Sequence, residues 1–470
     1  MKSNSKTIFR AVLTLVLLIA GIHTATSQDN MIFLGRNTPQ KFMINPALTP
    51  DNARFFISMP ILGSIGTNLS GNISYSDIFS LSSANKTVIE PKHLLNNLKE
   101  NSYIRNIFNL DIVNLGFRIS KTGFMGISLR ARTSIDVAFS KDAVSFIMDN
   151  PLERTGLFNI MVSPDALSWG ELGISYTQKI GKNISVGLRV KGIAGAVSAQ
   201  SDHMSILADK KFGSYTLQGN INLLSGNLNL TDDDEDKFGI KNISPGFGLD
   251  LGFSYVSNDK RVNAYASASD FGKIYWNEKS STKISSRTPD AKYEWVGITD
   301  IDNLINGNKS FKDVFDDTFD EMTSAMGVDT VKTAFTSNLP LTLQAGGKYS
   351  FDKELKHTVS VNALCILPQY AQTYYEFTAG YTYSSPNKRW DIMGAYTYKS
   401  VRAFNIGIGG LYRGRGFEIF LMTDSINSYF NYKTAKSANF RLGMNFYCPL
   451  ANKYKYKSGH KRQKDGEFIW

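Results

Sequence analysis

The histidine and glycine residues of the chain lack the spacing that catalysis or metal binding requires. Past residue 27 the histidines are scattered, at His93, His203, His357 and His460, with no H-E-x-x-H pattern. No G-x-S-x-G nucleophile motif occurs, and the glycines near Gly246 lie in a strand-like stretch instead of a phosphate loop. We therefore expect a protein that is not an enzyme, with no catalytic residue, metal or cofactor.

Two groups of residues have types and positions that suggest a role other than catalysis. The first is the triplet Asn45-Pro46-Ala47, where the prolines Pro46 and Pro50 exclude a central strand. From the residues alone, this region is a compact plug, a periplasmic arm or an ordinary loop. The second group consists of basic residues on one face of alternating stretches, which we expect to face the lumen of a barrel: Arg118, Arg130, Arg132, Arg189 and Lys191.

The stretch 171–194 is the clearest of the elements that must position these residues. Leu172 and Ile174, and after the turn 181–183 Leu188 and Val190, alternate with polar residues. This is the period of two β-strands joined by a tight turn. A soluble sandwich also alternates, but strands of about nine to eleven residues are the length that a tilted strand needs to cross a membrane.

Alternating segments flank short turns in five further places, so the sequence predicts six hairpins. The other five are 111–120 with 124–139, 246–257 with 262–271, 341–351 with 358–367, 374–384 with 390–399, and 404–412 with 417–422. A first strand within 55–75 and a last strand at 439–447 bring the total to about fourteen. Short turns alternate with long connections at 140–168, 196–245 and 272–338, as in a barrel whose turns face the periplasm.

The fold class that we predict is therefore all-β, a transmembrane antiparallel β-barrel of about 14 strands over residues 53–448. A mean hydropathy of −0.20 is too polar for a helical membrane protein, whereas half of every barrel strand is polar. Cys365 and Cys448 lie on segments that end at opposite membrane faces, so we expect two free thiols.

The two ends of the chain depart from the strand pattern. Residues 1–27 contain three basic residues, an apolar run and small residues before position 28, which predicts a cleaved signal peptide. Its removal lowers the formal charge from +11 to +8. Residues 28–52 are the candidate plug, and residues 449–470 form a basic periplasmic tail. Secretion excludes nucleic acid as a partner.

The long connections contain patterns of their own. Residues 310–327 predict an amphipathic helix over the barrel mouth, one of several helical insertions in the extracellular loops. Weaker helical patterns occur at 94–100 and 143–148, and alternation at 214–230 suggests a hairpin arm. The acidic run 232–236 lacks the order of a calcium loop, and we interpret it as solvated charge. The apolar face of the predicted helix consists of Phe311, Val314, Phe315, Phe319 and Met322.

Three segments resemble a Bacteroidota family of outer-membrane barrels of unknown function: 42–79, 266–276 with its D-F-G-x-I-x-W ending, and 335–349. More distantly, Asn45-Pro46-Ala47 resembles the triplet in the N-terminal hatch of the FadL family of fatty-acid and hydrocarbon transporters, and PorV-type secretion barrels are similar in the same way. The resemblance implies a fourteen-stranded barrel with these residues in a plug. The strand-three kink that makes a lateral exit in FadL is not identifiable in this sequence.

The function that we expect is passive uptake of small hydrophobic compounds by an outer-membrane FadL-like barrel. The alternative is a structural, adhesion or secretion-associated barrel of the PorV type. The expected partners are outer-membrane lipid and lipopolysaccharide, a hydrophobic small-molecule ligand, and a protein at the loops or the basic tail.

Overall fold

The computed structural model describes residues 30–36, 38–50, 53–58, 64–81, 87–88, 90–148, 156–211, 214–227, 242–286, 292–295, 324, 327–400 and 403–449. The predicted signal peptide, the apolar face of the predicted loop helix, the acidic run 232–236 and the tail from residue 450 lie outside the described residues. The strands are β1 (Ala53–Ser58), β2 (Ser64–Gly71), β3 (Ser80–Leu81), β4 (Thr87–Val88), β5 (Asn101–Arg118), β6 (Gly123–Ser140), β7 (Gly156–Ile180), β8 (Ile184–Lys211), β9 (Ser214–Gly226), β10 (Ser244–Val256), β11 (Val262–Trp276), β12 (Ser281–Ser286), β13 (Lys292–Trp295), β14 (Val328–Lys332), β15 (Phe335–Asn338), β16 (Leu341–Ser350), β17 (His357–Leu367), β18 (Tyr374–Ser384), β19 (Trp390–Lys399), β20 (Ala403–Arg413), β21 (Phe417–Thr423) and β22 (Ser437–Pro449). The helices are α2 (Asn30–Leu34), α3 (Gln40–Ile44), α4 (Tyr75–Ile78), α5 (Pro91–Asn97), α6 (Lys141–Met148), α9 (Ile426–Phe430) and the 3-10 helix η1 (Glu278–Ser280).

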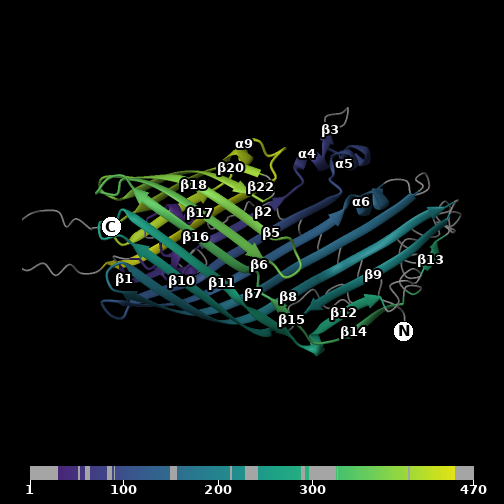
Figure 1. Ribbon diagram of the computed structural model, residues 1–470, viewed down its shortest axis with the longest axis horizontal. Coiled ribbons are helices and arrows are strands. Elements are labelled where there is room, and N and C mark those ends of the chain that lie inside the picture. Colours follow the sequence, from purple (N-terminus) through teal and green to yellow (C-terminus); the bar gives the residue numbers. More distant parts are fainter. Residues whose placement is uncertain are drawn as a thin grey trace, which may run out of the picture.

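Sixteen of these strands form one closed antiparallel ring, which confirms the predicted β-barrel (Figure 1). All six predicted hairpins are present as paired strands. The ring closes where β1 and β2, which lie end to end, pair with β22 on one side and with β5 on the other. Since β1 shares a place with β2, and β15 with β16, the sixteen strands occupy fourteen places around the ring.

The polarity of the ring is the reverse of that of a soluble protein. On β7 and β8, Leu172 is 54% exposed and Leu188 is 42% exposed, whereas Glu171 and Arg189 are almost completely buried. A barrel in a bilayer needs apolar side chains on its outer face, because that face contacts hydrocarbon chains. The alternation predicted from the sequence therefore places the strands across a membrane with their polar residues inward.

The two ends of the ring differ strongly in shape. One end carries the short turns of the six hairpins and is called the turn side below, and the other is the loop side. β7 and β8 have 25 and 28 residues, far more than the ~10 that a membrane crossing requires, and they continue beyond the ring on the loop side (Figure 1). The predicted connections 140–168 and 196–245 are thus wrong in part, because the hairpin keeps its pairing as a ribbon outside the membrane.

An extension of the sheet continues this ribbon. β9 pairs with β8, with β12 and with β13, and β12 pairs with β14, so the predicted arm at 214–230 is confirmed as β9 over most of its length. Ile221, Leu223 and Ile284 form a small buried cluster in this extension. Helices α4, α5 and α6 also lie on the loop side, where the sequence predicts helical insertions. No helix among the described residues is long and apolar enough to cross a bilayer.

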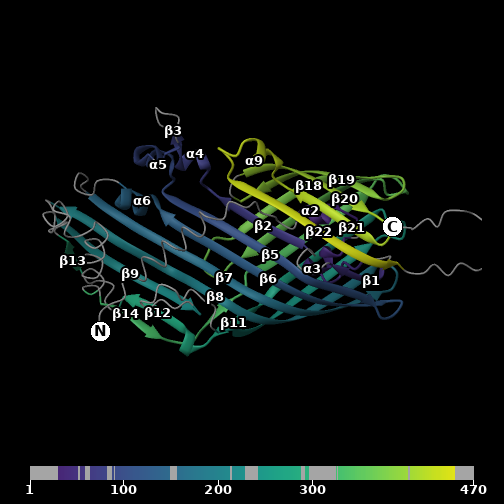
Figure 2. The same cartoon turned by 180° about the vertical axis from the view of Figure 1, so that it is seen from behind.

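The N-terminal segment, residues 30–50 without residue 37, lies within the ring (Figure 2). Its helices α2 and α3 consist of buried residues, although each helix is only five residues long. Helices this short are not stable alone, so contacts with the barrel wall must hold them in place.

Candidate functional site

The inner wall has a recess that fits the triplet Asn45-Pro46-Ala47. Gly187 of β8 and Gly252 of β10 are direct partners in the ladder. A Cβ atom at Gly187 would lie 2.2 Å from the Pro46 carbonyl carbon, and one at Gly252 would lie 2.2 Å from Asn45 Oδ1. Two opposite glycines therefore let the triplet approach the wall more closely than any other residue pair would allow.

Hydrogen bonds fix the triplet in this recess. The Asn45 amide donates to the carbonyl oxygens of Ala266 at 3.0 Å and Phe253 at 3.3 Å, and its Oδ1 accepts from the Ala47 backbone N–H at 2.9 Å. Thr177 Oγ1 donates to the Pro46 carbonyl. Asn45 thus ties the triplet to strands β10 and β11 and gives the Ala47 N–H of its own irregular segment a partner.

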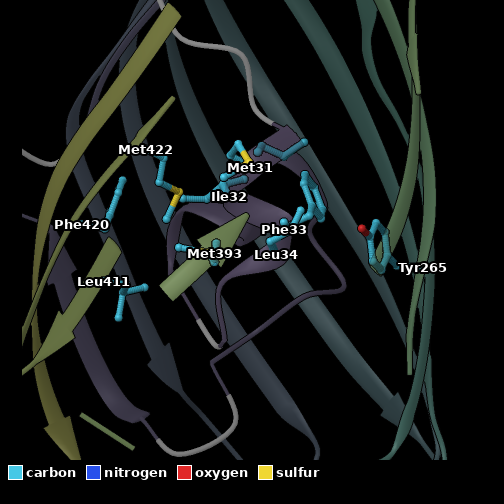
Figure 3. Close-up of a cluster of buried hydrophobic side chains, with 10 residues drawn as sticks. Met31, Ile32, Phe33, Leu34, Tyr265, Met393, Leu411, Phe420 and Met422 are labelled. Atoms are coloured by element: carbon cyan, nitrogen blue, oxygen red, sulfur yellow. The ribbon is translucent and has the colours of Figure 1, made fainter. Parts of the chain in front are cut away.

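Apolar contacts hold the other end of the N-terminal segment (Figure 3). The side chains of α2 pack against wall residues from β11 and from β19 to β21, and Phe33 stacks on Tyr265 with ring centroids 4.9 Å apart. Asn30 donates to Glu376 Oε2 at 2.6 Å, and Gln40 and Asn445 exchange two hydrogen bonds of 2.7 and 2.9 Å. Because these partners come from strands all round the ring, the segment spans the lumen. The members of this cluster are Met31, Ile32, Phe33, Leu34, Ile44, Tyr265, Met393, Leu411, Phe420 and Met422.

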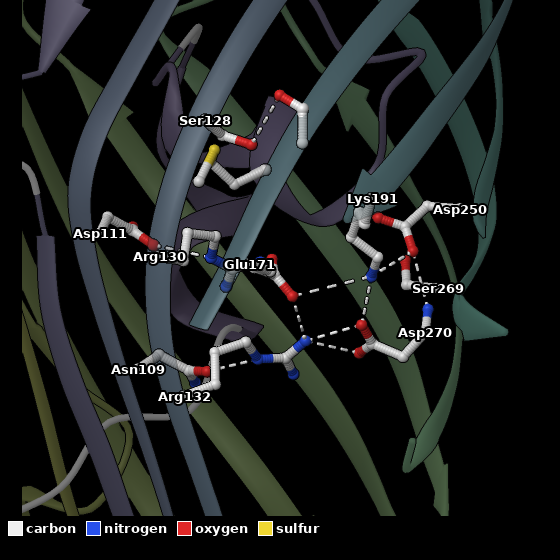
Figure 4. Close-up of polar contacts among 12 residues, drawn as sticks. Asn109, Asp111, Ser128, Arg130, Arg132, Glu171, Lys191, Asp250, Ser269 and Asp270 are labelled. Carbon is white, nitrogen blue, oxygen red and sulfur yellow. Dashed lines mark hydrogen bonds and ion pairs between the residues drawn. The ribbon is translucent and has the colours of Figure 1, made fainter. Parts of the chain in front are cut away.

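Charged residues, all buried except the half-buried Arg132, lie on the inner wall beside the N-terminal segment (Figure 4). We call them the charged belt: Asp111, Arg130, Arg132, Glu171, Arg189, Lys191, Asp250, Asp270 and Arg441. Strand register places opposite charges side by side, since Arg130 is the ladder partner of both Asp111 and Glu171. Arg130 lies 3.0 Å from a carboxylate oxygen of each.

The second half of the belt connects the wall to the N-terminal segment. Arg132 lies 2.7 Å from Asp270, and Lys191 lies 2.7 Å from Asp250 and also contacts Asp270. Arg189 pairs with Asp250 at 3.2 Å and donates hydrogen bonds to the backbone carbonyls of residues 42 and 43. Removing one member of such a buried network leaves a charge without a partner, at a cost of roughly 3 to 5 kcal/mol.

Further toward the loop side, the inner wall becomes apolar. Residues two apart on a strand share a face, so the residues next to the belt on the same strands also point inward. Trp169 comes two residues before Glu171, and Ile193 comes two residues after Lys191. Trp276 donates from Nε1 to Ser337 Oγ at 2.7 Å and stacks on Phe335 at 5.9 Å. We call this group the upper apolar cluster: Leu167, Trp169, Ile193, Ile274, Trp276 and Leu339.

A cavity of about 50 Å³ lies between part of the charged belt and the end of α3. Met43 and Ile44 line it on one side, and Ile107, Leu364 and Ile366 line it on the wall. An engineered apolar cavity of ~150 Å³ binds benzene, so this cavity is too small for an aromatic compound. Passage between the belt and α3 therefore requires the N-terminal segment to move.

The five predicted basic residues are not all in one place. The structure brings Arg130, Arg132, Arg189 and Lys191 together in the charged belt. Arg118 lies apart from them, with its guanidinium 3.3 Å from the Pro50 carbonyl oxygen and stacked over Phe124. The carboxylates and the upper apolar cluster were not predicted. The alternation of Asp270, Ile274 and Trp276 could have indicated them, because even spacing on a strand places residues on one face.

The thiols and the metal-ligating residue types add no further site. Cys365 is half-buried, Cys448 is exposed, and both are free. In the described ranges, no group of three or more His, Cys, Asp and Glu side chains is arranged to hold a metal ion.

Comparison with known proteins finds a family for most of the chain. A family of unknown function, DUF5723, matches residues 46–424. No curated protein matches the chain in sequence. Among solved structures, the Pseudomonas putida toluene transporter TodX has 10% identity and a TM-score of 0.38, covering 90% of this chain and 93% of its own. A Pseudomonas aeruginosa FadL homologue has 11% identity and a TM-score of 0.40, covering 88% and 95%. At these scores, the fold assignment rests on the strand pairing and not on the likeness.

Proposed function

The chain belongs to the family of unknown function DUF5723, and we propose that it is an outer-membrane channel for small hydrophobic compounds, closed by its N-terminal segment. The observation that carries the proposal is the order of surfaces along the lumen. From the loop side inward these are the upper apolar cluster, the charged belt and then the N-terminal segment.

The upper apolar cluster makes this stretch of the inner wall apolar and aromatic. Trp169 is covered by Arg132 and Trp276 by Phe335, so a compound would replace these contacts, and aromatic pairs gain about 0.5 to 1.5 kcal/mol beyond the area that they bury. A lumen that admitted polar solutes alone would have no use for two buried tryptophans in its wall.

The charged belt and the N-terminal segment close the axis below this cluster. The belt residues pair with one another, so a passing apolar compound would meet desolvated ion pairs instead of free charges. The proposal therefore needs the N-terminal segment to shift when a compound passes. Asn45-Pro46-Ala47 would act as its attachment point in the glycine recess.

An uptake measurement tests this function. Cells lacking the chain would be complemented with wild type, with Trp169→Ala, or with Trp390→Ala, and the initial rate of naphthalene entry compared. Trp390 is the matched control, because it lies on the outer face and is exposed. We expect uptake to depend on the chain and to fall several-fold with Trp169→Ala alone. Equal entry with and without the chain would sink the proposal.

A second candidate is a structural, adhesion or secretion-associated barrel. It is favoured by the sheet extension of β8, β9, β12, β13 and β14 beyond the ring, which is larger than a channel mouth requires. Purification of the barrel from its membrane separates the two candidates. A channel should be recovered alone, whereas a secretion or adhesion component should bring a protein partner in fixed proportion.

A further inference from the structure

A second cavity, of about 360 Å³, lies at the turn side between the N-terminal segment and the wall. It is reached past the turns that follow β7 and β10, and we call it the turn-side pocket. None of its lining residues is Asp or Glu. Five are lysines: Lys41, Lys179, Lys182, Lys260 and Lys348.

Two of these lysines direct their ammonium groups at the same carbonyl. Lys41 of α3, with 7% of its surface exposed, donates to the Gly35 carbonyl oxygen. Lys348 of β16 donates to the same oxygen at 3.0 Å and to the Leu34 oxygen at 3.2 Å. The two amino groups also hydrogen-bond each other. An ammonium has three N–H donors, so Lys41 keeps a donor that these contacts do not use.

Lys41 and Lys348 differ from two other lysines of the lumen, which form ion pairs with carboxylates. Lys191 contacts Asp250 and Asp270, and Lys399 contacts Asp424 at 2.9 Å. Within the described part of the chain, neither Lys41 nor Lys348 forms an ion pair with a carboxylate.

The acidic groups nearest to the pair are already engaged. Asp391 of β19 and Glu418 of β21 pair with Arg413 of β20, at 2.9 and 3.0 Å. The Arg36 side chain adds a further positive charge, donating to the Leu355 carbonyl. This corner of the lumen thus has four basic side chains, Arg36, Lys41, Lys348 and Arg413, against the two carboxylates Asp391 and Glu418.

We propose that the turn-side pocket binds the oxyanion group of a small ligand, a phosphate or a carboxylate, between Lys41 and Lys348. An oxyanion would accept the remaining N–H donor and offset the positive charge. Hydrogen bonds between an ammonium and an oxyanion are the strongest that an ammonium forms. The pocket has room for more than the anionic group, and Phe33, Leu48 and Tyr265 offer apolar contacts to the remainder of the ligand. This site does not depend on the proposed transport.

Occupancy of the pocket would also hold the N-terminal segment in the ring. Lys41 belongs to the segment and Lys348 to the wall, so one anion would bridge the two parts. Burial lowers the pKa of Lys41 to about 8, partly offset by the hydrogen bond with Lys348 and by the charge of Asp391. Binding should therefore weaken as the pH rises through 8 and Lys41 loses its charge.

Calorimetry on the full chain in lipid nanodiscs tests the site, with inorganic phosphate as one probe and acetate as the other. The variants are Lys41→Gln and Lys348→Gln, and the control is Lys121→Gln, an exposed lysine in a turn on the same side and outside the pocket. We expect at least one probe to bind wild type and the control equally, and both pocket variants more than about tenfold less tightly. Selective binding of phosphate or of acetate identifies the oxyanion.

Thermal unfolding without either probe guards against a trivial loss of folding. Both pocket variants should be at least as stable as wild type, because each removes a buried basic side chain from a corner where basic side chains outnumber carboxylates. Absence of binding for both probes to wild type, or binding that persists unchanged in both pocket variants, overturns the proposal.

Discussion

Leu188 and Arg189 are neighbours on β8 with opposite surroundings. Leu188 is exposed on the outer face, whereas Arg189 is fully buried and hydrogen-bonded to the backbone of α3. Replacing Leu188 by Arg should lower the free energy of unfolding in a bilayer by roughly 2 to 4 kcal/mol, because it moves a charge into hydrocarbon. The measurement is reversible urea unfolding in lipid vesicles.

The matched change at Arg189 checks the register. Arg189→Leu should also destabilise the barrel, since it leaves Asp250 without this partner and two carbonyls without a donor. If Leu188→Arg were harmless and Arg189→Leu were the more stable protein, the strand would have to be shifted by one residue.

The lowered pKa of Lys41 predicts how the stability of the protein depends on pH. Its pKa is about 8 in the folded chain against 10.5 for the free side chain, because it is buried. Between these values the unfolded chain binds more protons, so Lys41 makes stability rise with pH in this window. Below pH 8 its full destabilising effect is present. Lys41→Met should remove that part of the rise, at most about 3 kcal/mol, and should be the more stable protein at pH 7.

Unfolding curves at pH 7, 8, 9 and 10 measure this difference. The relevant quantity is the difference in free energy of unfolding between Lys41→Met and wild type at each pH, since the other lysines titrate equally in both proteins. A gap that stays constant over this range would mean that Lys41 has an ordinary pKa and that solvent reaches it.

At the scale of elements, the glycine recess makes β8 and β10 specific for the N-terminal segment. Gly187→Val should push Asn45-Pro46-Ala47 off the wall, because the new side chain would overlap the Pro46 backbone. Overpacking of this kind costs about 1 to 3 kcal/mol. Gly192→Val on the same strand is the control, since no heavy atom lies within 4 Å of its Cβ position.

Limited proteolysis from the turn side detects the displacement. Cleavage within residues 38–50 should become faster in Gly187→Val and stay at the wild-type rate in Gly192→Val. Equal protection in both variants would show that the segment does not rely on the recess.

The hairpins could be predicted from the sequence because successive residues of a strand point to opposite faces, one apolar and one polar. Alternation such as Leu188-Arg189-Val190 identifies a strand, and its turn fixes the partner. The far ends of β7 and β8 could not be predicted, since beyond the bilayer no hydrocarbon contacts the outer face and the apolar alternation is lost. The contacts of the charged belt also escaped prediction, because Arg132 and Asp270 are 138 residues apart and only ring closure brings them together.

At the scale of the whole molecule, the N-terminal segment and the wall are complementary in both shape and charge. Apolar side chains of α2 meet the wall from β19 to β21, while backbone carbonyls of α3 accept from Arg189. A barrel with fourteen places is wider than a barrel of ~8 strands, whose interior is filled by its own side chains. An unobstructed ring of this size would leak small solutes, so the segment is the natural candidate for a plug.

Deletion of residues 28–47 tests whether the segment closes the lumen. The truncated barrel should still form, since its closing ladders join β1 and β2 to β22 and do not involve the deleted residues. In planar bilayers the deletion should produce a large, steady ion current, because it removes the residues that fill the space between the belt and the turn side. The wild-type chain should stay closed.

The rival explanation is that the amphipathic helix predicted over residues 310–327 seals the barrel from the loop side. It makes the opposite prediction, because removing the N-terminal segment would leave that seal intact. The same bilayer recording distinguishes the two, provided that heat-modified migration on gels shows a folded barrel. A closed baseline in a folded deletion variant would exclude the plug, whereas a current that appears in the deletion variant and is absent from Gly192→Val would assign closure to the N-terminal segment.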